Sequence, residues 1–101
     1  MKAYLIDANQ KTITPAEIVG LDDVKKLIGY DSIDSDEVDA SGDRLYFDES
    51  CFLRDQTGKG RFKLDNLEPV ADKGVVAGSN GDALRDAAVE FAALHQRITW
   101  L

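Results

Sequence analysis

Cysteine is nearly absent from this chain of 101 residues, which contains Cys51 and no other. An intramolecular disulfide is therefore excluded, and a lone thiol fits a reducing cytoplasm. The sequence also lacks an apolar run of about 18 residues and a basic start followed by an apolar stretch, which argues against a membrane span and a signal peptide. We expect a cytoplasmic protein that does not bind membranes.

Histidine is equally scarce, because His95 is alone. One cysteine and one histidine cannot fill an ordinary zinc site unless carboxylates join them. The pair leaves open an alternative in which the protein is a small enzyme that uses Cys51 as nucleophile and His95 as base. Cys51 lies in an apolar context and His95 falls on the amphipathic face of an expected helix. We therefore interpret both as packed residues and expect neither enzyme activity nor catalytic residues.

The carboxylates of residues 31–43 do not have the spacing of a calcium-binding EF-hand loop. Such a loop needs ligands at alternating positions, a central glycine and a closing glutamate. A loop that starts at Asp34 has Val38 at its fifth position, and one that starts at Asp39 places Gly42 too early. We expect no metal site.

The segment Gly78-Ser79-Asn80-Gly81 resembles a phosphate-binding turn between a strand and a helix. It lacks the Walker lysine, and Asp82 would place negative charge where a phosphate would bind. We expect a capped turn and no cofactor. Whether this loop binds an anion stays open at this point.

Negative charge is concentrated in the middle of the chain, whose net charge is −7. Residues 31–60 contain nine acids and three bases, against four and four in residues 1–30 and six and five in residues 61–101. A field of this sign repels nucleic acid and anionic membranes and favours basic partners. We expect no direct contact with nucleic acid and predict a partner protein with a basic surface.

The predicted partner-binding site combines four of these carboxylates with one aromatic side chain. Its residues are Asp34, Asp36, Glu37, Asp39 and Tyr46. Tyrosine is common among the residues that dominate binding energy at protein interfaces. Tyr46 points away from its two apolar neighbours on a predicted strand, so it is either exposed near the acids or covered by the terminal helix in a second core.

Other interpretations of the acidic segment remain open. Carboxylates two residues apart on one strand face are about 6.6 Å apart, a spacing that suits a nucleic-acid mimic that inhibits a DNA-binding protein. The same acids on an exposed strand discourage pairing between molecules. A homo-oligomer that hides Tyr46 and Trp100 is a further possibility.

The pattern of apolar residues predicts one α+β domain built mainly on an antiparallel sheet. Alternation predicts strands over 2–7, 44–48 and 61–65, the last two in one meander. β-branched residues predict a strand over 12–19 that pairs with 2–7 as a hairpin, and an apolar run predicts a short buried strand over 73–78. Residues 98–101 are expected to form a short strand or a packed tail. Helical spacing predicts a short helix over 21–28 and a longer one over 82–96, packed on one face of the sheet. The predicted core residues are Tyr4, Ile6, Leu27, Leu45, Phe47, Phe62, Leu64, Val75, Phe91 and Leu94.

Two features of the predicted sheet concern its edges. Pro15 cannot donate to a strand ladder, which favours an edge position for 12–19. Ile33 and Val38 are an odd number of residues apart, so in a regular strand their side chains point to opposite faces. A strand in the acidic segment therefore needs a bulge or loses half of its alternation. The sequence does not decide whether residues 31–43 are ordered.

Several short stretches resemble a family of small bacterial and phage proteins classed as domain of unknown function 3846. The resembling residues are Leu27-Ile28-Gly29-Tyr30, Gly42-Asp43-Arg44-Leu45-Tyr46-Phe47-Asp48-Glu49, Phe62 and Gly74-Val75-Val76-Ala77-Gly78, within about residues 20–80. The segment Ser50-Cys51-Phe52-Leu53-Arg54 follows the family pattern only loosely. The resemblance implies a context of phages or mobile elements and no particular activity.

Overall fold

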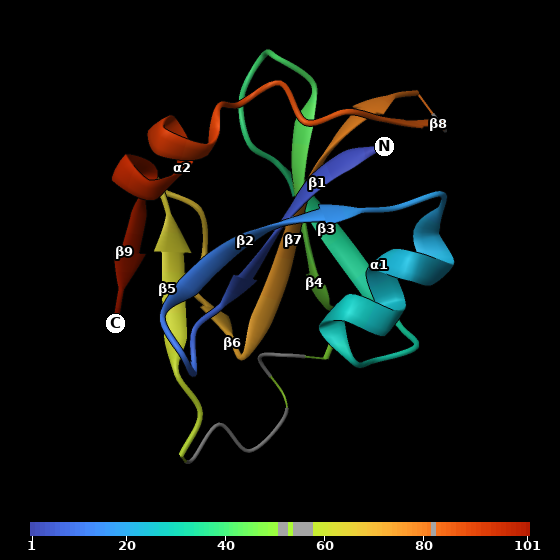
Figure 1. The fold of residues 1–101 in the computed structure, drawn as a ribbon. Helices are drawn as coiled ribbons and strands as arrows, with labels where there is room; N and C mark the ends of the chain where they lie inside the picture. The colour runs from blue at the N-terminus through green and yellow to red at the C-terminus, as the bar shows by residue number, and fades with distance from the viewer. Residues whose placement is uncertain (51–52, 54–57, 82) are drawn as a thin grey trace.

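The computed structural model of the chain describes residues 1–50, 53, 58–81 and 83–101. Nine strands and two helices follow one another along these residues (Figure 1). Their bounds are β1 Lys2–Asp7, β2 Thr12–Glu17, α1 Leu21–Ile28, β3 Ile33–Glu37, β4 Asp43–Asp48, β5 Arg61–Leu64, β6 Val70–Ala71, β7 Lys73–Asn80, β8 Ala83–Arg85, α2 Phe91–Arg97 and β9 Ile98–Trp100.

The strands form two antiparallel sheets. The larger has six strands in the order β2-β1-β7-β4-β3, with β8 paired to the end of β7, and the smaller has the order β6-β5-β9. The predicted meander from 44–48 into 61–65 is wrong, because β4 pairs with β3 and β7, whereas β5 pairs with β6 and β9. The chain leaves the larger sheet after β4, forms β5 and β6, and returns through β7.

An apolar core lies on each face of the larger sheet. One core contains Leu45 of β4, Phe62 of β5 and Leu94 of α2. The other contains Val24 of α1 and Val75 of β7. Figure 1 shows α1 on one side of the larger sheet and β5, β9 and α2 on the other. The fold is α+β and mainly antiparallel as predicted, but the two helices contribute to different cores instead of sharing one face.

Helix α1 has the predicted bounds. Its apolar stripe at helical spacing buries Val24 and Ile28 against the sheet, and Leu27 packs against the same core. Gly29 ends the helix in the left-handed conformation, with φ of 92°, and its N–H donates to the C=O of Lys25 at 2.7 Å. The signals for this helix are local, which is why the sequence predicts it well.

The predicted helix over 82–96 is wrong in its first half. Residues 83–85 form β8, which pairs with β7, and α2 begins only at Phe91. Strands β1 and β8 pair with the same side of β7, β1 along its first half and β8 along its end. The N–H of Ala87, just after β8, donates to the C=O of Lys2 at the start of β1. Tertiary pairing therefore overrides the helical spacing of this segment. The segment Gly78–Gly81 accordingly lies in a strand hairpin and not before a helix.

The N-terminal hairpin is confirmed, with β2 at the edge of the larger sheet. The N–H of Ile18 donates to the C=O of Met1, and this register places the backbone nitrogen of Pro15 on the outer side of β2. Proline therefore removes no ladder hydrogen bond there.

Most of the predicted core is buried, whereas Leu27 is half-buried and Phe91 is 39% exposed.

Candidate functional site

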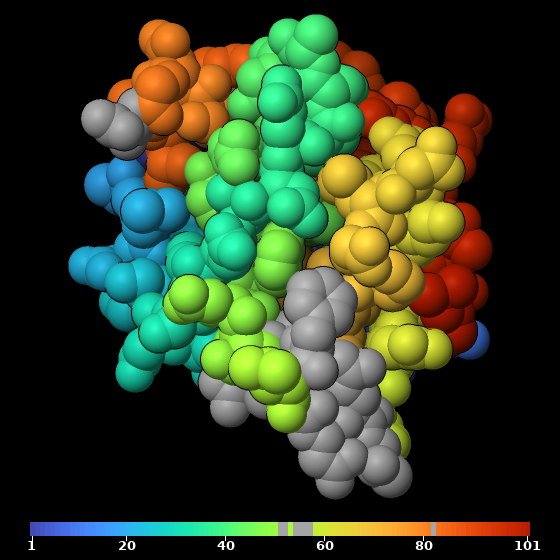
Figure 2. Space-filling view, turned by 180° about the vertical axis from the view of Figure 1, so that it is seen from behind, coloured from blue at the N-terminus to red at the C-terminus, as the bar shows by residue number. Residues whose placement is uncertain are grey.

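Strand β3 lies at the other edge of the larger sheet and carries most of the predicted acidic site. Asp34 and Glu37 are exposed and Asp36 is half-buried. The register with β4 places Asp34 and Asp36 on the side of the smaller sheet and Glu37, opposite Arg44, on the α1 side. We call Asp34, Asp36 and Glu37 the acidic edge. Figure 2 shows this part of the chain exposed across the middle of one face.

Side chains occupy the outward backbone groups in the middle of β3. The hydrogen bond from the N–H of Val38 to the C=O of Asp43 fixes the ladder so that Ser35 directs its N–H and C=O away from β4. The N–H of Ser35 donates to the carboxylate of Asp34 at 2.8 Å, and Arg44 Nη2 donates to the C=O of Ser35 at 3.1 Å. Another strand cannot pair here without breaking both bonds. At its centre the acidic edge therefore presents side chains, and not its backbone, to a partner.

The register of β3 with β4 is continuous over 33–37, so the strand contains no bulge. Ile33 packs against the core under α1 and Val38 against the core of the smaller sheet. The alternation is lost as the opposite parity of these two residues predicted. Residues 33–37 nonetheless form a strand that pairs with β4.

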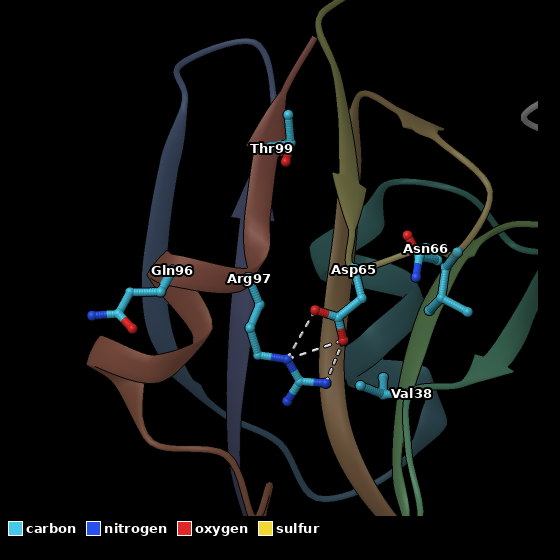
Figure 3. Close-up of a pocket in the computed structure, with 7 residues that line it drawn as sticks. Val38, Asp65, Asn66, Gln96, Arg97 and Thr99 are labelled. Atoms are coloured by element: carbon cyan, nitrogen blue, oxygen red, sulfur yellow. Dashed lines mark hydrogen bonds and ion pairs between the residues drawn. The ribbon is translucent and has the colours of Figure 1, made fainter.

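Asp39, the fourth predicted carboxylate, is bound within the protein. Its carboxylate accepts a hydrogen bond from the N–H of Ser41 at 2.8 Å and pairs with Arg97 Nη2 at 3.1 Å. Arg97 also donates from Nε and Nη2 to Asp65, at distances of 2.5–3.2 Å (Figure 3). We call Asp39, Asp65 and Arg97 the clasp, because they join the loop after β3 to the ends of β5 and α2.

Hydrogen bonds to residues of the clasp shift two pKa values. Ser41, through its side chain and its backbone N–H, and then Arg97 lower the pKa of Asp39. Asp65 and then Asp39 raise the pKa of Arg97. An open depression of about 680 Å³ lies beside the clasp, lined by Val38, Leu67 and Thr99 among others. Two carboxylates already neutralise its one guanidinium, so the depression is a poor anion site.

Replacing Arg97 with glutamine should lower the free energy of unfolding at neutral pH by about 1 kcal/mol, as expected for a partly exposed ion-pair network. The folded pKa of Asp39 lies below its ordinary 3.8. The paired carboxylate therefore stabilises the fold above that pH, and the contribution is lost as the pH falls through the folded pKa. Urea denaturation of both proteins should show the difference shrinking below pH 3.8. An Arg61→Gln control, on an exposed residue, should show no difference, and a pH-independent loss would contradict the prediction.

Tyr46 is not on the surface near the acids, because it is only 8% exposed. It belongs to the core under α1, so the second-core interpretation is the correct one of the two. The helix over this core is α1 and not the terminal helix that we expected. Burial raises the pKa of Tyr46, opposed by the charge of Arg44 and by a hydrogen bond with Ser79.

The alternative catalytic pair cannot be assembled from the described residues. Cys51 lies outside them. His95 is exposed on α2, and its ring contacts that of Phe91 edge to face with centroids 4.6 Å apart. The described part of the chain contains no group of three or more His, Cys, Asp or Glu side chains placed to hold a metal ion.

Two buried carboxylates escaped the sequence analysis, Asp43 at 1% and Asp48 at 3% exposure. Asp43 accepts hydrogen bonds from the backbone N–H groups of Ala88, at 2.8 Å, and Val89, at 3.0 Å. It thereby fixes the segment between β8 and α2 to the start of β4. The residues Ser41-Gly42-Asp43 are typical of a turn, and nothing local indicates partners more than 40 residues away.

Comparisons with models of protein families, with curated proteins and with solved structures found no match to this chain. The resemblance to domain of unknown function 3846 accordingly stays a prediction. No helix in the described ranges is both long enough and apolar enough to cross a lipid bilayer.

Proposed function

We propose that the protein is a non-enzymatic binding or accessory protein whose acidic edge engages a protein partner with a basic surface. The observation that carries this proposal is that the three carboxylates of the acidic edge are not neutralised by basic side chains in the described part of the chain. Asp34 is hydrogen-bonded to the next backbone N–H, and within the described part of the chain no Lys or Arg forms an ion pair with Asp34, Asp36 or Glu37. Their charge is therefore available to a cationic partner.

Geometry supports side-chain recognition by this strand. Successive carboxylates project to both sides of an edge strand whose central backbone groups are occupied. An electrostatic surface of this kind mainly raises the rate of association and loses strength as salt is added. Asp39 is excluded from the proposed surface because Arg97 binds it, and Tyr46 is excluded because it is buried.

A second candidate function is mimicry of nucleic acid. Asp34 and Asp36 lie on the same face of β3, about 6.6 Å apart in an extended strand. Two charges at this spacing suit a DNA-binding protein that carries a row of basic side chains. The resemblance of residues 20–80 adds a proposed origin in phages or mobile elements. A cytoplasmic location, no binding to membranes and a homo-oligomeric state also stay proposals.

We expect neutralisation of the acidic edge to abolish partner capture. The variant Asp34→Asn, Asp36→Asn, Glu37→Gln keeps side-chain oxygens, including an acceptor for the N–H of Ser35, but removes three charges. The immobilised wild-type chain is mixed with native lysate at low and at high salt. Bound proteins should be lost in the variant, and should be lost from the wild-type chain as salt rises.

The matched control is Asp22→Asn, Glu68→Gln, Glu90→Gln, which removes the same charge from three exposed acids elsewhere. It should capture partners as the wild-type chain does. No capture by the wild-type chain, or equal losses in both variants, would contradict the proposed surface. Release of the bound protein by short duplex DNA would favour mimicry over the first candidate.

A further inference from the structure

Helix α1 covers only part of its face of the larger sheet, and a second cavity lies beyond its first residue. This cavity has a volume of about 280 Å³, just below the range of about 300–1,000 Å³ that is usual for ligand sites. Its polar lining comes from Ser35, Arg44, Tyr46 and Ser79 on three neighbouring strands. Its apolar lining includes Leu21 of α1 and Leu84 of β8.

Among the residues that the structure describes, Arg44 has no carboxylate partner in this cavity. Its Nε donates to the Oγ of Ser35 at 2.8 Å, and its Nη2 donates to the C=O of the same residue. Glu37 lies opposite Arg44 in the strand register, yet the two form no ion pair, and in the described part of the chain Arg44 Nη1 makes no hydrogen bond. A half-buried guanidinium in a chain with 19 acidic residues thus keeps unused donors.

Two hydroxyl groups lie near this guanidinium. The phenol of Tyr46 and the hydroxyl of Ser79 line the same cavity as Arg44 and are hydrogen-bonded to each other, and burial raises the pKa of the phenol. Ser79 donates its own hydroxyl hydrogen to the C=O of Gly81 at 3.0 Å, which fixes its orientation. One half of the cavity is therefore polar, with Arg44 as the source of its unused donors, and the other half is apolar.

We propose that this cavity binds a small aliphatic carboxylate. The remaining N–H groups of Arg44 form a planar edge that matches a carboxylate. A short hydrocarbon chain lies against Leu21, which is 47% exposed, and Leu84. A phosphate fits this lining less well, because the side chains of Leu21, Ala83 and Leu84 carry no donor for its further oxygens. This ligand site shares strand β3 with the acidic edge but opens on the α1 side of the sheet, and it does not rest on the proposed function.

Titration of the ¹⁵N-labelled chain with butyrate, acetate and inorganic phosphate, at constant ionic strength, tests the site. Butyrate should cause saturable amide shifts around Ser35, Arg44, Ser79 and Leu84. It should bind more tightly than acetate by about fourfold for each additional CH₂ that it buries. Phosphate binding as tight as that of butyrate, or shifts spread over basic residues all around the surface, would overturn the proposal.

Variants separate the two halves of the cavity. Arg44→Gln should weaken butyrate at least about tenfold, as loss of a charge-assisted pair predicts. Arg61→Gln, with the same change of charge on an exposed residue of β5, should leave binding unchanged. Leu21→Ala alters a surface side chain and keeps the fold even if Arg44→Gln does not. It should weaken butyrate and leave acetate unaffected, and equal effects on both ligands, or a loss in Arg61→Gln, would overturn the proposal.

Discussion

Replacing Asp43 with alanine should lower the free energy of unfolding by about 3 kcal/mol. The carboxylate is almost fully buried, and it is the acceptor for the backbone N–H groups of Ala88 and Val89. Alanine would leave both donors without a partner and remove a charge-assisted pair of hydrogen bonds. The segment between β8 and α2 would lose its attachment to β4.

Urea denaturation at neutral pH measures this loss, with Asp43→Asn as the matched comparison. Asparagine keeps one oxygen acceptor, so it should preserve one of the two bonds and cost clearly less than alanine. Hydrogen exchange should show Ala88 and Val89 among the amides that lose most protection in Asp43→Ala. A loss under about 1 kcal/mol, or equal losses for the two variants, would mean that water replaces the carboxylate without penalty.

Replacing Phe62 with alanine should cost about 4 kcal/mol, the largest effect expected from a single substitution in this chain. The ring is fully buried between the larger and the smaller sheet, and it packs edge to face against Trp100 with centroids 6.4 Å apart. Gly74 of β7 leaves the space that the ring fills, because a Cβ there would lie 2.7 Å from Cζ of Phe62. The variant would leave a cavity that β7 cannot fill by a small shift.

Phe91→Ala is the control, since it removes the same ring from a side chain that is 39% exposed and packs against Tyr4 and His95. We expect it to cost about 1 kcal/mol. In thermal and urea denaturation, the loss in the free energy of unfolding should therefore be severalfold larger for Phe62→Ala than for Phe91→Ala. Similar losses would show that the two sheets do not pack around Phe62 as described.

The elements that the sequence predicts well have their determinants close together along the chain. The apolar stripe of α1 and the glycine that follows it define that helix without help from the rest of the fold. The N-terminal hairpin and its edge position follow from alternation and from Pro15. Strand β7 follows from the apolar run around Val75 and Val76.

The errors arise where distant residues decide the structure. Helical spacing favoured a helix from Asp82, but the unoccupied side of β7 recruits residues 83–85, and Asp43 binds the amides that follow. The order of strands β4, β7 and β5 depends in the same way on pairing across the chain. Pairing and packing over the whole fold therefore decide these segments, because local propensities are weak in comparison.

The candidate site was predicted only in part, for a related reason. Asp34, Asp36 and Glu37 lie together on an exposed strand, as a run of neighbouring acids indicates. The sequence could not reveal that Asp39 pairs with a residue 58 positions away, or which helix covers Tyr46. The lone arginine of the second cavity is likewise visible only when three strands are placed side by side.

The position of β7 between β1 and β4 has a consequence for how the protein is made. The N-terminal hairpin and the β3–β4 hairpin share no ladder until residues 73–80 insert between them. While the ribosome is still adding earlier residues, the nascent chain holds two separate ribbons, and isolated ribbons are barely stable in water. Synthesis that stalls before residue 73 would therefore release a chain that is open to proteolysis and to capture by chaperones.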